Sequence, residues 1–329
     1  MHRMLLPARH CSQVLKADGI NIVTSTDLPS KHDKYDVFSW HGVPHPKLLP
    51  LMSNMQYEGK KLMWSVDDDY TDLPPWNPIT FTPEQMGGYN IACKISDSIL
   101  CSTDYLASTF KSPHIKKFVT PNMLEVDQYL PFPRHNPSDL TTQTVRILWS
   151  GSNTHRGDLE NIVEAVSYVI EKYSYAKVDF IFFGECHPEL RKRHLYKGVT
   201  EVDPQPLGNY HHVLKTITPD IWLCPIDDHK FNYSKSNLKV LEGMALQAAV
   251  VASNVGPYKD TIEHGATGFL ATTTEDWINA ICTYVENPKI RSMAVANGYQ
   301  HVNDNYNWNN PKCKASWLDM YRNVVKGEC

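Results

Sequence analysis

The sequence predicts an α/β protein whose parallel sheets are covered by helices on both faces. Short apolar segments alternate with helical patterns along most of the chain. These segments are continuous rather than alternating in polarity, as is typical of strands buried on both faces. The length of 329 residues corresponds to about two domains of roughly 150 residues each. Right-handed crossovers would then make doubly wound domains, with ligands at the carboxyl ends of the strands.

The first half of the chain is predicted to form a small α/β unit. We expect strands at residues 21–25, 35–40, 60–66 and 98–101. We expect helices at residues 46–57, 83–96 and 104–110. Residues 71–83 contain four prolines and predict a long irregular loop, which in a compact domain is often functional.

Three prolines in the segment 131–139 predict a linker between two domains. Beyond it the pattern becomes more regular. Strands are expected at residues 145–149, 178–183, 199–202, 220–226, 249–253 and 267–270. Helices are expected at residues 158–173, 208–216, after Ser236, and at 258–263 and 274–285. The predicted domains are residues 1–140 and 141–305, and a tail at 306–329 is expected to pack back on the first domain.

Composition limits the class of protein. The formal net charge is −4, so no global positive field marks a nucleic-acid binder, although a local basic groove remains compatible with it. No apolar run approaches the roughly 18 residues of a membrane-spanning helix, and the N-terminal residues lack a secretory hydrophobic segment. Eight cysteines include no C-x-x-C pair and several lie in apolar stretches, which favours reduced thiols in a cytoplasmic protein.

Residues 231–242, FNYSKSNLKVLE, carry the most informative polar pattern. Lys235, Ser236 and Lys239 precede or begin a helix, and Glu242 follows on that helix. A buried strand at 248–253 and the turn NVGPY, which contains Gly256, come next. Cations and backbone N–H groups near a helix start can hold an anionic ligand. A solvated helix face with an ordinary ion pair is the simpler alternative.

Several segments of the second half resemble GT-B glycosyltransferases of the retaining family 4 type. They occur in the family's order: WSGSNTH at 149–155, FFG at 182–184, CPI at 224–226, the stretch 231–242, VVASNVGPY at 250–258 and HGATGFL at 264–270. The first half is similar to short soluble members from phages and bacteria through KKLMWSVDDD at 60–69 and its proline-rich loop. The resemblance implies two Rossmann-like domains facing across a cleft, the first on the acceptor side and the second on the donor side. It places the protein in the cytoplasm, or in the host cytoplasm if a phage encodes it.

The resemblance also implies a reaction. The enzyme would be a hexosyl- or pentosyltransferase that moves a sugar from a nucleoside-diphosphate sugar, with UDP the expected nucleotide, to an acceptor hydroxyl. The anomeric configuration would be retained, and neither a metal nor another cofactor would be required. The sequence leaves the sugar, the nucleotide and the oligomeric state open.

The resemblance assigns Glu242 to the ribose hydroxyls, and Lys235 would supply a charge to the diphosphate. The other expected donor-binding residues are Gly151, Ser152, His155, Arg156, Ser236, Lys239 and Gly256. Ser234 departs from the family pattern, because many members have a glutamate eight residues before the ribose glutamate. We expect Ser234, Asn232 or Lys235 to hold the sugar instead, so the identity of the sugar stays open.

Asp67-Asp68-Asp69 follows a predicted strand, as the metal-binding D-x-D motif does in GT-A glycosyltransferases. Only 66 residues precede it, too few for the complete nucleotide-binding half of that fold. Asp68 or Asp69 is therefore expected at the cleft, as a base for the acceptor hydroxyl. Capping of the loop by these side chains is the structural alternative.

Two loop residues, His41 and Trp76, are candidates for acceptor binding. Trp40 is also close to a loop and could stack on an acceptor ring. Trp64, Trp149 and Trp222 lie within predicted strands and are expected in the core.

The acceptor has two candidate classes. A hydroxymethylated base in phage DNA is the first, and it would use cations at residues 60–61, 111–117 and 189–197. A cell-surface or lipid-linked glycan is the second. A third hypothesis is a binding module for nucleotide sugars without catalysis.

Overall fold

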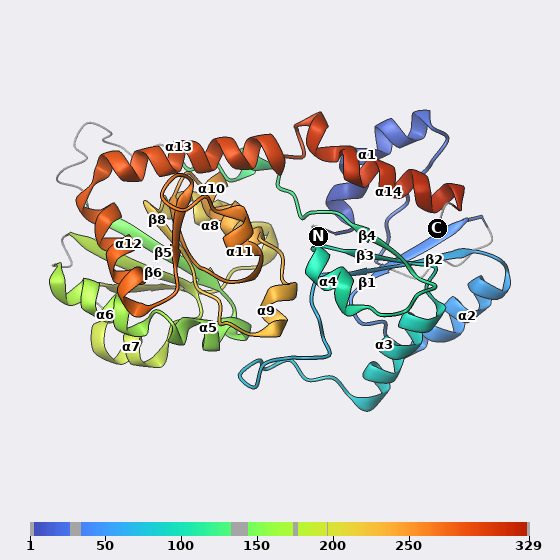
Figure 1. Cartoon of the computed structure of the whole chain (residues 1–329), viewed down its shortest axis with the longest axis horizontal. Helices are drawn as coiled ribbons and strands as arrows, with labels where there is room; N and C mark the ends of the chain where they lie inside the picture. The colour runs from blue at the N-terminus through green and yellow to red at the C-terminus, as the bar shows by residue number, and fades with distance from the viewer. Residues whose placement is uncertain (1–2, 27–33, 133–143, 174–176, 196, 328–329) are drawn as a thin grey trace.

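Two separate parallel sheets organise the chain, one in each half (Figure 1). The computed structural model describes residues 3–26, 34–132, 144–173, 177–195 and 197–327. The first sheet has the order β1-β2-β3-β4, and the second has the order β10-β9-β8-β5-β6-β7. All neighbouring strands in both sheets are parallel. The predicted α/β class is therefore confirmed.

The first sheet has four strands within the described residues and is surrounded by short helices. Its strands are β1 (Val37–His41), β2 (Lys61–Val66), β3 (Ser98–Cys101) and β4 (Lys116–Val119). The surrounding helices are α1 (Leu5–Ala17), η1 (Pro46–Leu48), α2 (Leu49–Tyr57), α3 (Pro83–Ile95), α4 (Asp104–Thr109) and η2 (Val126–Gln128). Local sequence accounts for two helix starts, because Thr82 and Gln85 form a capping box on α3 and Thr103 caps α4.

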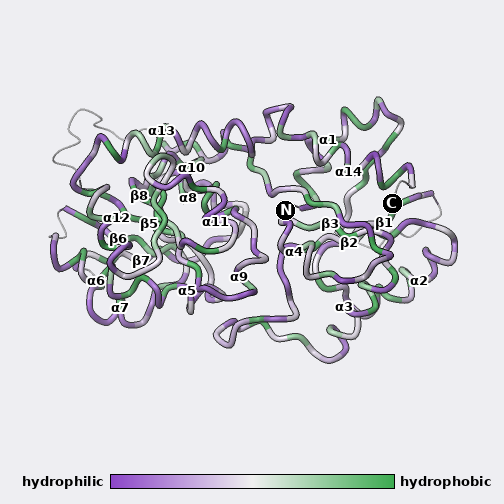
Figure 2. Tube along the Cα trace, viewed as in Figure 1, coloured by the Kyte–Doolittle hydropathy of each residue, from purple (hydrophilic) through white to green (hydrophobic). Residues whose placement is uncertain are grey.

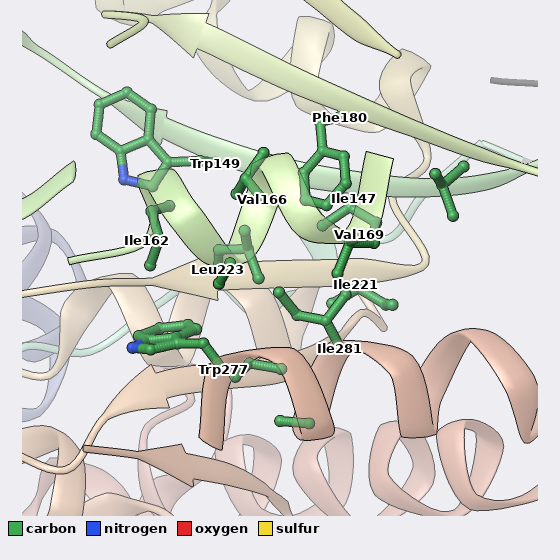
Figure 3. Close-up of a cluster of buried hydrophobic side chains, with 14 of the residues drawn as sticks. Ile147, Trp149, Ile162, Val166, Val169, Phe180, Ile221, Leu223, Trp277 and Ile281 are labelled. Atoms are coloured by element: carbon green, nitrogen blue, oxygen red, sulfur yellow. The ribbon is translucent and has the colours of Figure 1, made fainter. Parts of the chain in front are cut away.

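In the part of the chain that the structure describes, the second sheet has six strands, against four in the first, and it is buried on both faces. Its strands are β5 (Val145–Gly151), β6 (Val178–Gly184), β7 (Val199–Val202), β8 (Ile221–Cys224), β9 (Ala249–Ser253) and β10 (Gly268–Ala271). Alternate residues of β5 enter two different cores: Ile147 and Trp149 pack in one, shown in Figure 3, and Leu148 packs in the other. Hydrophobic colour accordingly runs along the central strands in Figure 2.

Helices cover both faces of this second sheet. They are η3 (Asn153–His155), α5 (Arg156–Glu160), α6 (Val163–Lys172), α7 (Pro188–His194), α8 (Leu207–Ile217), α9 (Lys230–Ser234), α10 (Leu238–Ala245), α11 (Gly256–Thr261), α12 (Thr274–Glu286) and α13 (Pro288–Asn305). The direction of strand addition reverses between β5 and β8, since β6 and β7 extend one way and β9 and β10 the other. Such a reversal opens a crevice at the carboxyl ends of the two strands.

The chain returns to the first half at its end. Helix α13 runs along the second half, and η4 (Pro311–Lys314) then leads into α14 (Ala315–Lys326), which lies beside α1 (Figure 1). Trp308 and Trp317 are fully buried in a cluster with Leu6 of α1 and Met63 of β2. The indole N–H of Trp317 donates to the carbonyl of Pro121 at 3.1 Å. The tail thereby becomes part of the core of the first half.

The structure corrects several expectations about the elements. Residues 21–25 are not a strand, and the first helix, α1, was not predicted from the sequence. The helix expected at 158–173 is split into α5 and α6. Most of the expected linker at 131–139 lies outside the described residues, so the predicted domain boundaries stay a prediction.

Three tryptophans lie where the sequence predicts them, and Trp40 does not. Trp64, Trp149 and Trp222 are fully buried, as expected. Trp40, which we expected near an acceptor, is instead buried against Trp64 in the core of the first half. Within the described ranges, no helix is both long enough and apolar enough to cross a membrane.

Candidate functional site

A cavity of about 320 Å³ lies between the two halves, at the carboxyl edges of both sheets. The first half contributes the end of β1, the turn after β2 and the segment after β4, with His41, Asp67, Asp68 and Asn122. The second half contributes the turn after β5 and residues 231–242, with His155, Lys235, Ser236, Lys239 and Glu242. Residues from distant parts of the sequence therefore share one polar cavity.

Glu242 is the most buried carboxylate of the cavity. It lies on α10, is 9% exposed, and accepts a hydrogen bond of 3.1 Å from the Tyr129 hydroxyl. The Tyr129 oxygen lies 2.9 Å from Nε2 of His211. Burial raises the pKa of Glu242 to about 7, against the opposing effects of Tyr129 and Lys239. Glu242 therefore titrates in the neutral range and can accept hydrogen bonds from a ligand when ionised.

Replacing Glu242 with glutamine is expected to stabilise the ligand-free protein at pH 8 by about 1–3 kcal/mol. The folded protein holds the Glu242 proton more tightly than the unfolded chain, because its pKa rises from 4.5 to about 7. The stability contributed by this proton is complete below pH 4.5 and is lost as the pH rises through about 7. Thermal unfolding of both proteins between pH 5 and 8 measures the effect. If the Tm of Glu242→Gln differed from that of the wild type by the same amount at the lowest and the highest pH, the prediction would be contradicted.

Two lysines face the cavity from the second half in different ways. Lys239 donates to the carbonyl of Ser150 at 2.8 Å and lies 4.9 Å from the Trp149 ring centre. Burial lowers the pKa of Lys239 to about 8. Lys235 lies over the Phe231 ring at 4.9 Å and forms no ion pair with any described residue. Lys235 is therefore the more available cation for an anionic ligand.

His155 is held in place by Asp158. Its Nδ1 lies 2.7 Å from Oδ2 of Asp158, and burial lowers the pKa of His155 to about 3, so the ring is neutral. The other carboxylate oxygen of Asp158 accepts from the backbone N–H of Asp227 and from the side chain of Asn232. Asp158 thereby joins the turns after β5 and β8 to α9. This role of Asp158 was not predicted from the sequence, although an acid three residues after His155 at a helix start was a visible signal.

The wall formed by the first half carries a cluster of acids. Burial raises the pKa of Asp68 to about 6, and Asp67 adds to this shift while Lys235 opposes it. His41 Nδ1 lies 3.3 Å from the Ser65 hydroxyl, and burial lowers its pKa to about 4. Asp69 does not line the cavity, because its Oδ1 accepts from the backbone and side chain of Thr71. Loop capping, the structural alternative, describes Asp69, while Asp68 faces the cavity.

Ser234 does not line the cavity. Its hydroxyl is fully buried, donates to the carbonyl of Phe231 at 2.6 Å and accepts from the backbone N–H of Asp69 at 3.1 Å. The Thr103 hydroxyl donates to the Ser234 carbonyl at 3.2 Å. Ser234 therefore connects the two halves, and α4 and α9 face each other at this contact (Figure 1). The expectation that it holds a sugar is corrected, since both functions of its hydroxyl are already used.

Replacing Ser234 with alanine is expected to destabilise the protein by about 1–2 kcal/mol, because one buried hydrogen bond is lost and the N–H of Asp69 loses its acceptor. The shift in Tm measures this loss. Ser292→Ala, on the exposed face of α13, is the matched control. A Tm for Ser234→Ala equal to that of the control would contradict a connecting role.

The remaining candidates lie around the cavity rather than in it. Gly151 has no side chain, and the Trp149 ring packs against it: a Cβ at this position would come within 2.7 Å of the ring. Gly256 has a positive φ of 51° at the start of α11. Arg156 pairs with Glu185 at 2.8 Å. The Ser152 hydroxyl pairs with Thr154. None of these four residues lines the cavity.

Trp76 is also placed differently from the acceptor-binding expectation. Its ring packs on Gly157, where a Cβ would come within 2.4 Å of it, and meets His229 edge to face. The proline-rich loop therefore crosses from the first half to the second. Its neighbours Asn77 and Ile79 line the cavity instead of Trp76.

One part of the chain matches a known protein family, and most of the chain aligns with solved structures. Residues 144–287 match the family model "Glycosyl transferases group 1". No curated protein sequence shows significant similarity to the chain. Sucrose-phosphate synthase from Thermosynechococcus elongatus aligns with a TM-score of 0.64 and 15% identity, over 90% of this chain and 76% of that one. HepE from Anabaena in complex with UDP-glucose aligns with a TM-score of 0.60 and 14% identity, over 96% of this chain and 88% of HepE.

TarM, whose mutant structure is described as from S. aureus, aligns with a TM-score of 0.62 and 14% identity, over 87% of this chain. This chain covers only 54% of the length of TarM. The two parallel sheets, the cavity between them and these alignments agree on one architecture. Residues 144–287 thus match a group 1 glycosyl transferase domain, within a chain that has the GT-B fold.

Proposed function

We propose that this protein is a glycosyltransferase that moves a sugar from a nucleoside diphosphate to an acceptor hydroxyl. The observation that carries the proposal is the wall formed by Lys235, Lys239 and Glu242 at the strand reversal of the second sheet. A diphosphate needs fixed cations, and a ribose needs a hydrogen-bond acceptor. The similarity to HepE, whose structure is described as a complex with UDP-glucose, favours UDP as the nucleotide.

In the proposed reaction, the bond between the anomeric carbon and the β-phosphate oxygen breaks while a bond to the acceptor oxygen forms. The electron pair of the broken bond stays on the phosphate, where Lys235 stabilises the developing charge. The acceptor proton passes to the leaving phosphate oxygen if the configuration is retained. Asp68, on the opposite wall, would orient the acceptor hydroxyl. Closure of the two halves would exclude water, which otherwise hydrolyses the donor.

The positions of the cations favour a saccharide over DNA as the acceptor. Lys61 begins β2 and Lys116 begins β4, so both lie at the edge of the first sheet opposite to Asp67. On α7, Arg191 pairs with Glu201 and Arg193 pairs with neighbouring acids. The stretches that a modified DNA base would require therefore do not reach the cavity. We propose a cell-surface or lipid-linked glycan as the acceptor.

A panel of UDP-, GDP- and dTDP-sugars tests the activity. Calorimetry measures donor binding, and release of the nucleoside diphosphate measures turnover with water, neutral oligosaccharides or hydroxymethylcytosine DNA. We expect one UDP-sugar to bind and to be consumed faster with an oligosaccharide. Binding without any turnover would favour the non-catalytic module. Failure of every nucleotide sugar to bind would refute the proposal.

A further inference from the structure

Three side chains from distant segments of the first half meet on one wall of the cavity. Arg3 precedes α1, Asp67 follows β2 and Asn122 follows β4, and all three line the cavity. Arg3 is 1% exposed and Asn122 is 2% exposed. The fold therefore buries an arginine and an amide beside a carboxylate, an arrangement that is rare unless the polar atoms are satisfied.

Part of this cluster is satisfied by the protein. Nη1 of Arg3 donates to the carbonyl of Thr120, and the guanidinium lies 4.8 Å from the Trp317 ring centre. Nδ2 of Asn122 donates to the Ser236 hydroxyl at 2.9 Å, across the boundary between the two halves. These contacts hold Arg3 and Asn122 in defined positions against the cavity.

Four other buried polar atoms of the cluster have no hydrogen-bond partner among the described residues. They are Nε and Nη2 of Arg3, Oδ1 of Asp67 and Oδ1 of Asn122. Nε of Arg3 and Oδ1 of Asp67 are 3.3 Å apart, which is ion-pair distance, but they are not aligned for a hydrogen bond. Unpaired buried polar atoms are unusual, so each calls for a partner that the described residues do not supply.

The unpaired atoms include donors on Arg3 and acceptors on Asp67 and Asn122. A hydroxyl group both donates and accepts, so two neighbouring hydroxyls of a sugar can satisfy donors and acceptors together. A phosphate only accepts, and it would face the carboxylates of Asp67 and Asp68. The chemistry of this wall therefore favours a neutral polyol over an anion, whereas Lys235 and Lys239 on the opposite wall favour an anion.

We propose that Arg3, Asp67 and Asn122 form a subsite for the neighbouring hydroxyls of a neutral saccharide acceptor. The subsite rests on the proposed function and deepens it, because it names the acceptor chemistry. Trp317 and Thr120 position Arg3, so the tail helix α14 supports the acceptor side of the cavity. Ser236, which Asn122 contacts, connects the subsite to residues 231–242.

Acceptor binding can be measured with the full chain loaded with UDP. The probes are methyl α-D-glucopyranoside, which is neutral, and glucose 6-phosphate, which is anionic, titrated by saturation-transfer NMR. Asp67→Asn and Asn122→Leu each remove an acceptor at similar side-chain volume. Arg9→Met is the control, since Arg9 is an exposed arginine of α1 that pairs with Glu125.

We expect the wild type and Arg9→Met to bind the neutral glycoside and to bind glucose 6-phosphate no more tightly. Asp67→Asn and Asn122→Leu should weaken glycoside binding about tenfold or abolish it, with the UDP affinity unchanged in Asp67→Asn. Equal glycoside affinity in the wild type and both variants would mean that a buried water satisfies these atoms, and it would overturn the subsite. Tighter binding of glucose 6-phosphate would overturn the assignment to a neutral ligand.

Two further readouts separate the possible failures. If UDP itself does not bind to the wild type, the proposed function fails before the subsite is tested. If UDP binds and the neutral glycoside does not, the donor side stands and the subsite fails. Thermal unfolding of each variant identifies a loss of fold; where Asn122→Leu unfolds, Asp67→Asn decides the result.

Discussion

Replacing Lys235 with methionine is expected to reduce the rate of sugar transfer about 100- to 1,000-fold, with little change in stability. The ammonium group lines the cavity and has no ion pair among the described residues, and its contact with Nδ1 of His155 is long, at 3.5 Å. Methionine keeps an unbranched stem against the Phe231 ring. The missing charge should act mainly on the leaving phosphate, where negative charge develops as the bond breaks.

The measurement is kcat for the donor that the nucleotide-sugar panel identifies. Lys230→Met is the matched control, because Lys230 is an exposed lysine at the start of α9 and does not line the cavity. The control should transfer sugar at the wild-type rate. Equal kcat for Lys235→Met and the control would remove Lys235 from the reaction. A rise in KM for the donor with unchanged kcat would mean that Lys235 contributes to donor binding and not to the transfer step.

Replacing Glu242 with glutamine is expected to weaken UDP binding about 30- to 100-fold. Glutamine has nearly the same shape, so the change removes the charge and leaves the packing of α10 intact. The wild-type affinity should increase as the pH rises through about 7, because ionisation of Glu242 creates the acceptor for ribose hydroxyls. The affinity of Glu242→Gln should not show this step.

Calorimetric titration with UDP from about pH 5.5 to about pH 8.5, which spans the Glu242 pKa of about 7, measures both effects. Glu263→Gln, at an exposed position after α11, controls for the loss of one negative charge. A similar loss of affinity in both variants would indicate a general charge effect. A wild-type affinity independent of pH would show that Glu242 does not meet the ligand as a carboxylate.

The buried strands and the local loop chemistry were accessible from the sequence. Strands β5, β6, β8 and β9 are continuous apolar runs, and such runs have few alternatives to a buried parallel sheet. Lys235, Lys239 and Glu242 share one short stretch, so their joint appearance at one wall follows from local structure. Helix α1 was missed although its amphipathic pattern is stronger than those of α2 and α3, and its partner, α14, lies at the other end of the chain.

Other parts of the site depend on contacts between distant residues. Ser234 looks like a pocket residue in sequence, but its hydroxyl is used by Phe231 and Asp69. Trp76 lies in a loop of the kind that binds ligands, yet the absence of a side chain at Gly157 gives its ring a place to pack. Each outcome depends on how the two halves meet, which no local pattern encodes.

By itself, the sequence determined the α/β class, the order of most strands along the chain and the polar stretch at 231–242, because these depend on neighbouring residues. The tertiary structure alone decided which polar groups share the cavity. Arg3, Asp67 and Asn122 meet only because the parallel sheet places the carboxyl ends of β2 and β4 at the same edge, on either side of β3, and α14 holds Arg3 against them. Burial then shifts the pKa of Asp68 and Glu242 into the neutral range, and burial is a property of the packed fold.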